Sequence, residues 1–193
     1  MRAFLAGALP DSLTASLSQR LEPVRVATPQ ARWVPAKSLH LTLVFLGEID
    51  AAAVPDLASA FAAVAHRHPP MALRIAGPHT FGPPRRPRVL VAELAGEIEA
   101  LGALCADALQ AAGERVAVET DRPFRPHVTL ARARSAGGDP LLGRCKTALA
   151  GSLSGEFVLE RLTFFRSETL AGGTAHTPLA AWLLGNQPHR HPA

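Results

Sequence analysis

The sequence predicts an α/β fold of the α+β type, in which two pseudo-symmetric lobes face each other across a central cleft. Each lobe is expected to be a mostly antiparallel sheet backed by helices. Three observations predict this arrangement: strand-like segments are mixed with amphipathic helical ones, no long linker interrupts the 193 residues, and the pattern His-x-Thr-Leu occurs twice, at 40–43 and at 127–130. We therefore expect residues 1–193 to form a single bilobed domain with one motif in each lobe.

The N-terminal third predicts two strands and two helices. Residues 2–7 are short and apolar and predict a strand, and Asp11 or Ser12 is placed to cap the helix that follows. The next strand carries the first motif and ends at Gly47, and Pro55 then fits the first turn of a second helix. The apolar faces of the two helices are Leu13, Leu17 and Leu21 in the first and Leu57, Phe61 and Val64 in the second.

The rest of the chain continues this mixture. Residues 71–77 and 88–94 are expected to be strands, joined by a loop too rich in Pro and Gly to be regular. The clearest helix covers 97–113, with Gly113 as its C-terminal cap. Beyond it the sequence predicts a strand at 123–133, a helix at 139–151, and strands at 156–167 and 179–185. This order puts the two motif strands in corresponding places of two similar halves.

Composition narrows the class of protein. No segment approaches the roughly 18 consecutive apolar residues that a membrane span needs, and the N-terminal segment breaks at Pro10 and Asp11, too early for a signal sequence. We therefore expect a soluble, cytoplasmic protein that does not bind a membrane. Cys105 and Cys145 lack the paired spacings of a zinc or redox motif, so they are expected to be reduced, buried thiols.

The charge of the chain is compatible with an anionic partner but does not identify one. The formal net charge is +4, and the basic residues are almost all arginine, with lysine only at Lys37 and Lys146. The planar guanidinium suits phosphate oxygens, which favours a phosphorylated or nucleic-acid partner. A compositional bias toward Arg, Ala, Gly and Pro explains the excess equally well, so the charge alone decides nothing.

The two motif segments set polar residues in a strongly apolar context. Side chains alternate between the faces of an extended strand, so each motif offers a polar pair on one face and an apolar set on the other. Alternation places His40, Thr42 and Val44 opposite Leu41, Leu43 and Phe45, and it places His127, Thr129 and Ala131 opposite Val128 and Leu130. One His-x-Thr would usually be structural, but a second copy with the same following Leu favours function. If the lobes face each other, both polar pairs converge in the cleft.

Two histidines and two threonines in one cleft suit acid–base chemistry on a phosphodiester. Histidine has a reference pKa near 6.5, so one imidazole can act as general acid and the other as general base near neutral pH. Threonine hydroxyls can donate hydrogen bonds to non-bridging phosphate oxygens. Such a site needs neither a nucleophilic side chain nor a metal when the bond is already strained, as in a five-membered 2′,3′-cyclic phosphate at an RNA end.

Two longer segments carry a family resemblance. The segments RWVPAKSLHLTLVFLGEI and PFRPHVTLAR resemble the two signatures of the two-histidine (2H) phosphoesterase superfamily, and specifically the bacterial and archaeal RNA 2′,3′-cyclic phosphodiesterases, the ThpR, LigT or 2′-5′ RNA ligase family. The segments PRRPRVLVAEL and LTFFRSETLAGG extend the resemblance over nearly the whole chain. It implies a bilobed fold with the active site between the lobes. The implied activity is metal-independent hydrolysis of a 2′,3′-cyclic phosphate to a 2′-phosphomonoester, with 2′-5′ RNA ligation in some members.

The resemblance also implies a role for each motif residue. His40 is similar to the histidine that protonates the departing 3′ oxygen, and His127 is similar to the one that activates water. Thr42 and Thr129 match the phosphate-binding hydroxyls, and Arg132 matches an arginine that supports phosphate binding.

Two positions complicate this match. Strict alternation from His127 would turn Arg132 to the opposite face, so its role requires the strand to end or bulge after Leu130. Family members often carry a tyrosine near the C-terminus, where this chain, which has none, has His176.

Other candidates stay open between binding and structural roles. Arg85, Arg86 and Arg88 would contact an RNA backbone or remain solvated, and Trp33, Phe81 and Phe124 would stack on a terminal base or pack in the core. His66, His68, His189 and His191 lack the spacing and the carboxylate companion of a zinc site. No metal or cofactor is therefore expected. A Walker-type phosphate loop is also absent, so any ligation would reverse the opening of a cyclic phosphate.

The sequence thus predicts a monomeric enzyme whose partner is RNA with a 2′,3′-cyclic phosphate end. Two alternatives use the same cleft. One is a non-catalytic module that binds RNA ends, and the other is a phosphodiesterase for a small cyclic nucleotide derivative.

Overall fold

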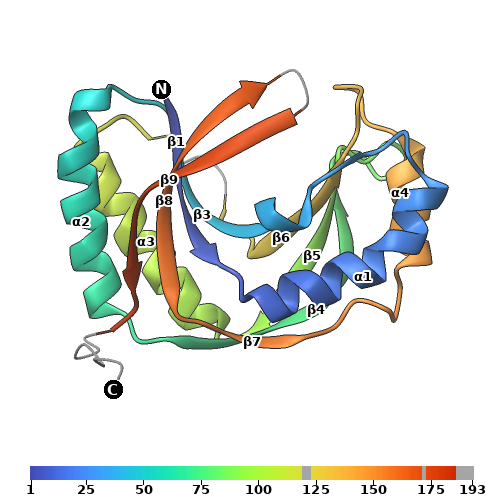
Figure 1. Ribbon diagram of the computed structural model, residues 1–193, viewed down its shortest axis with the longest axis horizontal. Coiled ribbons are helices and arrows are strands. Elements are labelled where there is room, and N and C mark those ends of the chain that lie inside the picture. The colour runs from blue at the N-terminus through green and yellow to red at the C-terminus, as the bar shows by residue number, and fades with distance from the viewer. Residues whose placement is uncertain (119–122, 171–172, 186–193) are drawn as a thin grey trace.

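The computed structural model describes residues 1–118, 123–170 and 173–185, which contain four α-helices and nine strands (Figure 1). The N-terminal elements are β1 (Arg2–Ala8), α1 (Asp11–Ala27), β2 (Arg32–Trp33), the 3-10 helix η1 (Ala36–Ser38), β3 (His40–Glu48), the 3-10 helix η2 (Ala51–Ala53) and α2 (Val54–Arg67). They are followed by β4 (Met71–Phe81), β5 (Val89–Gly96), α3 (Ile98–Gly113), β6 (His127–Arg132), α4 (Pro140–Ala148), β7 (Glu156–Leu159), β8 (Arg161–Leu170) and β9 (Gly173–Leu183).

All nine strands belong to one curled antiparallel sheet. Its order is β7-β4-β5-β6-β3-β1-β8-β9, and β2 pairs with β6 beside this path. The two motif strands, β6 and β3, are therefore neighbours at the centre of the sheet. Three strands lie outside each of them, so the order is balanced about the β6–β3 pair. The α+β class with antiparallel sheet and helical backing is confirmed, and the two lobes share a single sheet.

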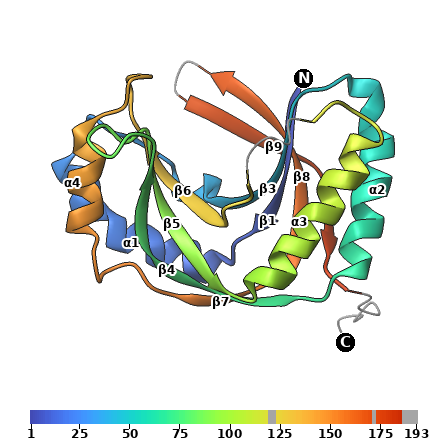
Figure 2. The same cartoon turned by 180° about the vertical axis from the view of Figure 1, so that it is seen from behind.

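The helices divide between the two halves of the sheet (Figures 1 and 2). α2 and α3 pack on each other and against β3, β8 and β9, whereas α4 packs against β4 and β5. α1 follows β1 in sequence but lies in the half that contains α4. We call β1, β3, β8, β9, α2 and α3 the β3 lobe, and the remaining helices and strands the β6 lobe. Each lobe thus combines N-terminal and C-terminal segments, so the lobes are not successive halves of the chain.

One predicted loop is partly a strand. β4 continues past residue 77 to Phe81, because a bulge at Gly77, with φ of 139°, shifts the register against β5. The position of Pro78 in this strand also has a structural explanation. β7 pairs only with Met71–Arg74, so β4 is an edge strand at Pro78, which is where proline occurs in sheets.

Two helix ends also differ from expectation. α1 begins at Asp11 with no side-chain cap, so neither Asp11 nor Ser12 acts as predicted. α3 includes Gly113 as its last helical residue, and Glu114 follows in a right-handed conformation, so Gly113 is not the left-handed cap. Both differences concern one turn and leave the helices in place, because their buried apolar faces fix them to the sheet.

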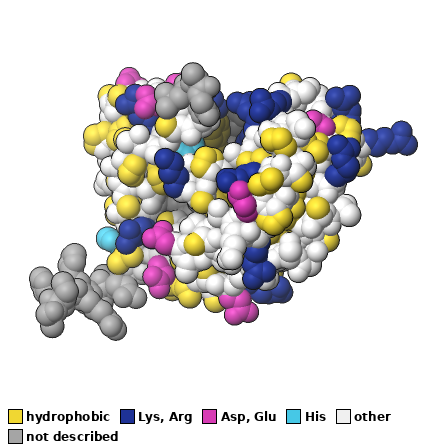
Figure 3. Space-filling model, turned by 45° about the vertical axis from the view of Figure 1, so that its right-hand side comes forward, with side chains coloured by type: hydrophobic (Ala, Val, Ile, Leu, Met, Phe, Trp, Pro, Cys, Tyr) yellow, Lys and Arg dark blue, Asp and Glu magenta, His cyan; other side chains and the backbone are white. Residues whose placement is uncertain are grey.

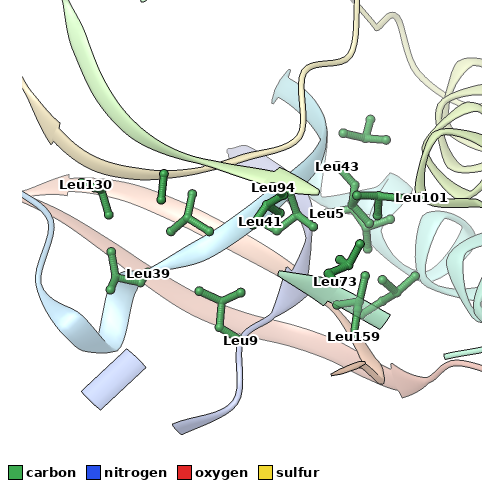
Figure 4. Close-up of a cluster of buried hydrophobic side chains, with 14 of the residues drawn as sticks. Leu5, Leu9, Leu39, Leu41, Leu43, Leu73, Leu94, Leu101, Leu130 and Leu159 are labelled. Atoms are coloured by element: carbon green, nitrogen blue, oxygen red, sulfur yellow. The ribbon is translucent and has the colours of Figure 1, made fainter. Parts of the chain in front are cut away.

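The core is built mainly from leucine and lies behind the motif strands. Leu41 of β3 and Leu130 of β6 are fully buried in a cluster that also contains Leu5 and other leucines (Figure 4). Burial of each such side chain contributes about 1.5–3 kcal/mol, which anchors one face of each motif strand and leaves the other face for polar residues. Within the described residues, no helix combines the length and apolar character that a membrane crossing needs.

Candidate active site

The structure brings the two motifs together. β3 and β6 run antiparallel with Leu41 opposite Val128, which brings His40 to the side of Thr129 and Thr42 to the side of His127. All four polar side chains are half-buried. Figure 3 shows the surface hollowed between the lobes, with histidine on the wall of the hollow and Lys or Arg side chains around it.

Each motif strand contains a β-bulge immediately after its threonine. In β3, Leu5 of β1 is opposite Val44 and the next β1 residue is opposite Thr42, so Leu43 has no partner in β1. In β6, the same skip leaves Leu130 without a partner in β5. The first six residues of both strands share one burial pattern, in which the fourth and fifth residues are both buried and the sixth is exposed.

The two bulges change which side chains share the polar face. The bulge after Thr129 meets the condition that the sequence set for Arg132, which lies on the face of His127 and Thr129. The equivalent residue of β3 is Phe45, which is 47% exposed and has the Arg2 guanidinium 5.4 Å from its ring centroid. The expectation that Phe45 shares the apolar face of Leu41 and Leu43 is therefore wrong.

The same shift corrects two smaller expectations. Val44 and Ala131 were expected on the polar face, but both are buried with the leucine that precedes them. A bulge inserts one residue into its strand relative to the partner strand, so alternation is restored only after two successive side chains point to the same side.

Both motif histidines are held in the same tautomer. His40 donates a hydrogen bond from Nδ1–H to the Ser38 carbonyl, 2.7 Å away, and His127 donates one from Nδ1–H to the Arg125 carbonyl, 2.6 Å away. In each case the acceptor lies two residues earlier in the chain. Because Nδ1 carries the proton, Nε2 of each neutral ring is the atom that can accept a proton from a ligand or water.

The surroundings of His40 are aromatic. Its ring stacks on Phe4 at a centroid distance of 4.9 Å and meets the ring of His176 edge-on at 5.3 Å. The pKa of His40 is lowered from 6.5 to about 4. Burial is the main cause and the nearby His176, Arg132 and His127 contribute, while the bond to Ser38 acts in the opposite direction.

The surroundings of His127 are more polar. The ring contacts the Phe81 ring edge-on at 4.9 Å, and Glu93 of β5 is directly opposite in the sheet. Burial again lowers the pKa of His127, and the Arg125 carbonyl and then the Glu93 carboxylate oppose that shift, while Arg132 adds to it. A nearby negative charge therefore raises the pKa of His127, whereas none of the groups that shift the pKa of His40 is an anion.

Arg132 faces a second arginine across the sheet. Arg32 of β2 is directly opposite Arg132 of β6. Burial, together with the Arg32 charge, lowers the pKa of Arg132. Like charges opposite each other in a sheet repel, and an anion between them removes the repulsion. No pattern in the sequence pointed to Arg32, because only the pairing of β2 with β6 places it beside the motif.

The remaining candidates separate clearly. Phe81 lies in the site, whereas Trp33 and Phe124 pack against the hydrophobic core, and Trp33 Nε1–H donates to the Thr28 carbonyl. His68 pairs with Asp107 on α3, at 2.9 Å, so it belongs to a helix–helix contact. His189 and His191 lie outside the described residues.

The arginine loop and the cysteines take simple positions. Arg85 and Arg88 are exposed, and Arg86 donates a hydrogen bond to the Gly138 carbonyl. Cys105 and Cys145 are buried free thiols. Among the described residues, no three His, Cys, Asp or Glu side chains are arranged to hold a metal ion.

Comparison with known proteins agrees with this geometry. The model of the 2′-5′ RNA ligase superfamily matches residues 9–170. A Thermus thermophilus protein named RNA 2′,3′-cyclic phosphodiesterase is 32% identical over 203 residues, which cover 100% of this chain and 95% of that protein. A Methanothermobacter thermautotrophicus protein of the same name is 23% identical and covers 95% of this chain and 99% of its own length.

Solved structures show the same fold. TT0787 of Thermus thermophilus has a TM-score of 0.74 and 29% identity, and the match covers 97% of this chain and 100% of that one. E. coli LigT complexed with 3′-AMP has a TM-score of 0.70 and 26% identity, over 96% of this chain and 98% of that one. With the family model matched over most of the chain and a relative aligned along its whole length, this chain belongs to the 2′-5′ RNA ligase superfamily of two-histidine phosphoesterases.

Proposed function

We propose that this chain hydrolyses 2′,3′-cyclic phosphate ends of RNA to 2′-phosphomonoesters, without a metal, by acid–base catalysis from His40 and His127. The observation that carries the proposal is the pair of histidines on adjacent strands, each with Nδ1–H tied to a backbone carbonyl and Nε2 free to exchange a proton. The names of the relatives support the substrate, because those proteins are RNA 2′,3′-cyclic phosphodiesterases. One chain supplies both histidines, so we propose a monomer in which residues 1–193 act as one bilobed domain.

Phosphate binding is proposed to fall to the side chains around the two histidines. The hydroxyls of Thr42 and Thr129 donate to the non-bridging oxygens, and Arg132 supplies a positive charge on the same face. Arg32 adds a second charge opposite Arg132. A bound phosphodiester thus replaces repulsion between two guanidinium groups with two attractive contacts.

The proposed reaction moves two protons. A water oxygen attacks phosphorus while His127 Nε2 takes a proton from it, and the bond from phosphorus to the 3′ oxygen breaks as His40 Nε2 gives that oxygen a proton. The 2′ oxygen keeps the phosphate. The two histidines end the cycle with their protons exchanged, and solvent restores them before the next turnover.

The pKa of His40 in the free protein bears on its proposed role as the acid. His40 must carry the proton before reaction, yet burial holds its pKa at about 4 in the absence of a ligand. A phosphodiester carries a negative charge, so its binding beside His40 raises that pKa toward the value an acid needs. Should the anion stabilise the proton on His127 instead, the roles reverse and the product is the 3′-phosphate.

The decisive experiment uses an RNA oligonucleotide with a 2′,3′-cyclic phosphate end in excess chelator. The wild-type protein should form a 2′-phosphate, and its rate should depend on pH as a bell whose limits belong to the histidine pair. H40A and H127A should lose turnover, while H66A, on the exposed surface of α2, should retain it. Wild-type turnover by H40A or H127A would rule out the mechanism, and loss of all activity in chelator would rule out its metal independence.

The same assay separates the alternatives. An RNA-end binding module would bind the oligonucleotide tightly and yield no product after long incubation. A phosphodiesterase for small nucleotides would cleave a cyclic mononucleotide as fast as the RNA, with little dependence on salt. The proposed enzyme should prefer RNA, and its affinity for RNA should fall steeply as the salt concentration rises, because Arg85 and Arg88 are exposed for contacts with the RNA backbone.

Ligation would open the same cyclic phosphate with a different nucleophile. A 5′-hydroxyl end could attack the cyclic phosphate in place of water, so that the same proton transfers yield a 2′-5′ bond. We propose this as a secondary activity, and incubation with a second RNA that has a 5′-hydroxyl end tests it through the appearance of a longer product.

A further inference from the structure

A third histidine lies at the β3 lobe end of the site. His176 belongs to β9, where Ser167 of β8 is directly opposite. Its ring meets the rings of Phe4 and His40 edge-on, with centroid distances of 4.9 and 5.3 Å. The proposed mechanism does not use His176, but the ring of His176 contacts that of His40, which the mechanism does use.

The two ring nitrogens of His176 are in different situations. Nδ1 is buried and has no hydrogen-bond partner among the residues that the structure describes. The neighbouring rings of Phe4 and Phe165 offer no acceptor to it. Nε2, at the far end of the ring from the backbone, is the nitrogen that remains for a ligand.

The apolar setting selects one tautomer. A buried N–H without an acceptor is costlier than a buried lone pair without a donor, so the proton of neutral His176 belongs on Nε2. This is the opposite of His40 and His127, whose Nδ1 atoms carry the proton because a backbone carbonyl accepts it. His176 therefore differs from them in offering a donor to the site.

The same setting keeps His176 neutral. A charged ring would place a second N–H at the buried Nδ1, and burial accordingly lowers the pKa of His176. The groups packed against it are Phe4, Phe165, Ser167 and His40, and none of them is an anion. Arg166 and Glu168 flank Ser167 and pair with each other, and strand alternation turns them to the other face of β8.

We propose that His176 is a substrate-binding residue of this site, which stays neutral and donates a hydrogen bond from Nε2–H to an oxygen of the bound phosphate group. Its distance from His40 allows one phosphate to contact both rings, since neighbouring oxygens of a phosphate are about 2.5 Å apart and each hydrogen bond adds nearly 3 Å. The inference rests on the proposed function for the source of that phosphate, an RNA end.

The tautomer is tested without any turnover. Long-range proton–nitrogen NMR correlations of the protein labelled at histidine should show the proton on Nδ1 in His40 and His127 and on Nε2 in His176 at pH 7. Addition of inorganic phosphate should shift the Nε2–H signal of His176. A proton on Nδ1 of His176, a charged ring at pH 7, or a signal that phosphate leaves unmoved would overturn the inference.

Three variants measure the contribution to binding. H176F keeps the ring and removes the donor, so the dissociation constant for inorganic phosphate should rise about tenfold. H176Y restores a neutral donor and should bind within about threefold of the wild type. H66F, at an exposed position on α2, is the control for a histidine-to-aromatic change and should bind as the wild type does. Equal phosphate affinity in H176F and the wild type would overturn the inference, provided that their thermal unfolding midpoints agree.

The outcomes keep this inference separate from the proposed function. If the wild type binds phosphate through His176 but leaves cyclic-ended RNA unchanged, the proposed function fails and the binding role stands. If the RNA is hydrolysed while H176F matches the wild type in phosphate affinity and in KM, the proposed function stands and the role of His176 fails.

Discussion

The two motif strands have nearly the same backbone and very different neighbours. In β3 and β6 the histidine is tied through Nδ1 to a carbonyl two residues earlier, and a bulge follows the threonine. Their partner strands diverge. β1 places Ala8 opposite His40 and Phe4 opposite Phe45, whereas β5 places Glu93 opposite His127 and Val89 opposite Arg132.

This difference shows how two copies of one motif come to lie in different environments. The repeated local sequence fixes the tautomer and the direction of each histidine. The neighbouring strands then set the pKa of each ring. Burial in the aromatic β3 lobe lowers the pKa of His40 strongly, while the Glu93 carboxylate of the β6 lobe raises the pKa of His127, and Arg132 lowers the pKa of both. Equivalent backbone positions therefore place the two histidines in different electrostatic environments.

Removing either histidine is the largest expected effect and tests whether both strands contribute. H40A and H127A should each lower kcat/KM by about 100- to 10,000-fold, the usual contribution of a general acid or base. Single-turnover assays on a cyclic-ended oligonucleotide measure this loss. If kcat/KM falls much less in one variant than in the other, only one of the two strands supplies a catalytic histidine.

Acid should destabilise the protein through His40. Between pH 6.5 and about 4 the unfolded chain binds a proton at this ring that the folded state excludes, so the free energy of unfolding should fall as pH decreases through this range. The contribution of His40 is up to about 3 kcal/mol. Urea denaturation at a series of pH values measures it, and H40Q should show a flatter dependence. An identical dependence in H40Q would show that the aromatic cluster does not exclude the charge.

Arg132 and Phe45 are equivalent positions and should behave differently. R132M should lower kcat/KM by about 10- to 100-fold, because a charged hydrogen bond to phosphate is lost. The same change should raise the pKa of both histidines, since the Arg132 charge lowers each of them. F45M is the matched control and should leave kcat/KM unchanged. Similar losses in the two variants would mean that the site does not distinguish its halves.

Glu93 provides the smallest and most local test. E93Q removes the charge that raises the pKa of His127, so that pKa should fall while the pKa of His40 keeps its value. An NMR titration of the two imidazoles follows both groups in one experiment. A shift at His40 of equal size would contradict the separation of the two environments.

Sequence patterns predicted the fold class and the helices because these depend on local periodicity. The repeated His-x-Thr-Leu needs only four residues to indicate a paired site, and alternation is correct for His40, Leu41 and Thr42. The pattern failed at Phe45 and at the strand that contains Pro78, where a bulge changed the register. A bulge depends on how a strand pairs with its partner, which the strand's own residues do not encode.

By itself, the sequence determined the two polar pairs, the apolar faces that hold the motif strands in the core, and the resemblance to the two-histidine phosphoesterases. Only the tertiary structure decided what stands beside each pair: Arg32 opposite Arg132, Glu93 opposite His127, and Phe4 with His176 against His40. The physical reason is that these contacts join strands far apart in the chain. Their effects on charge depend on distance and burial, which exist only once the sheet has curled and closed around the site.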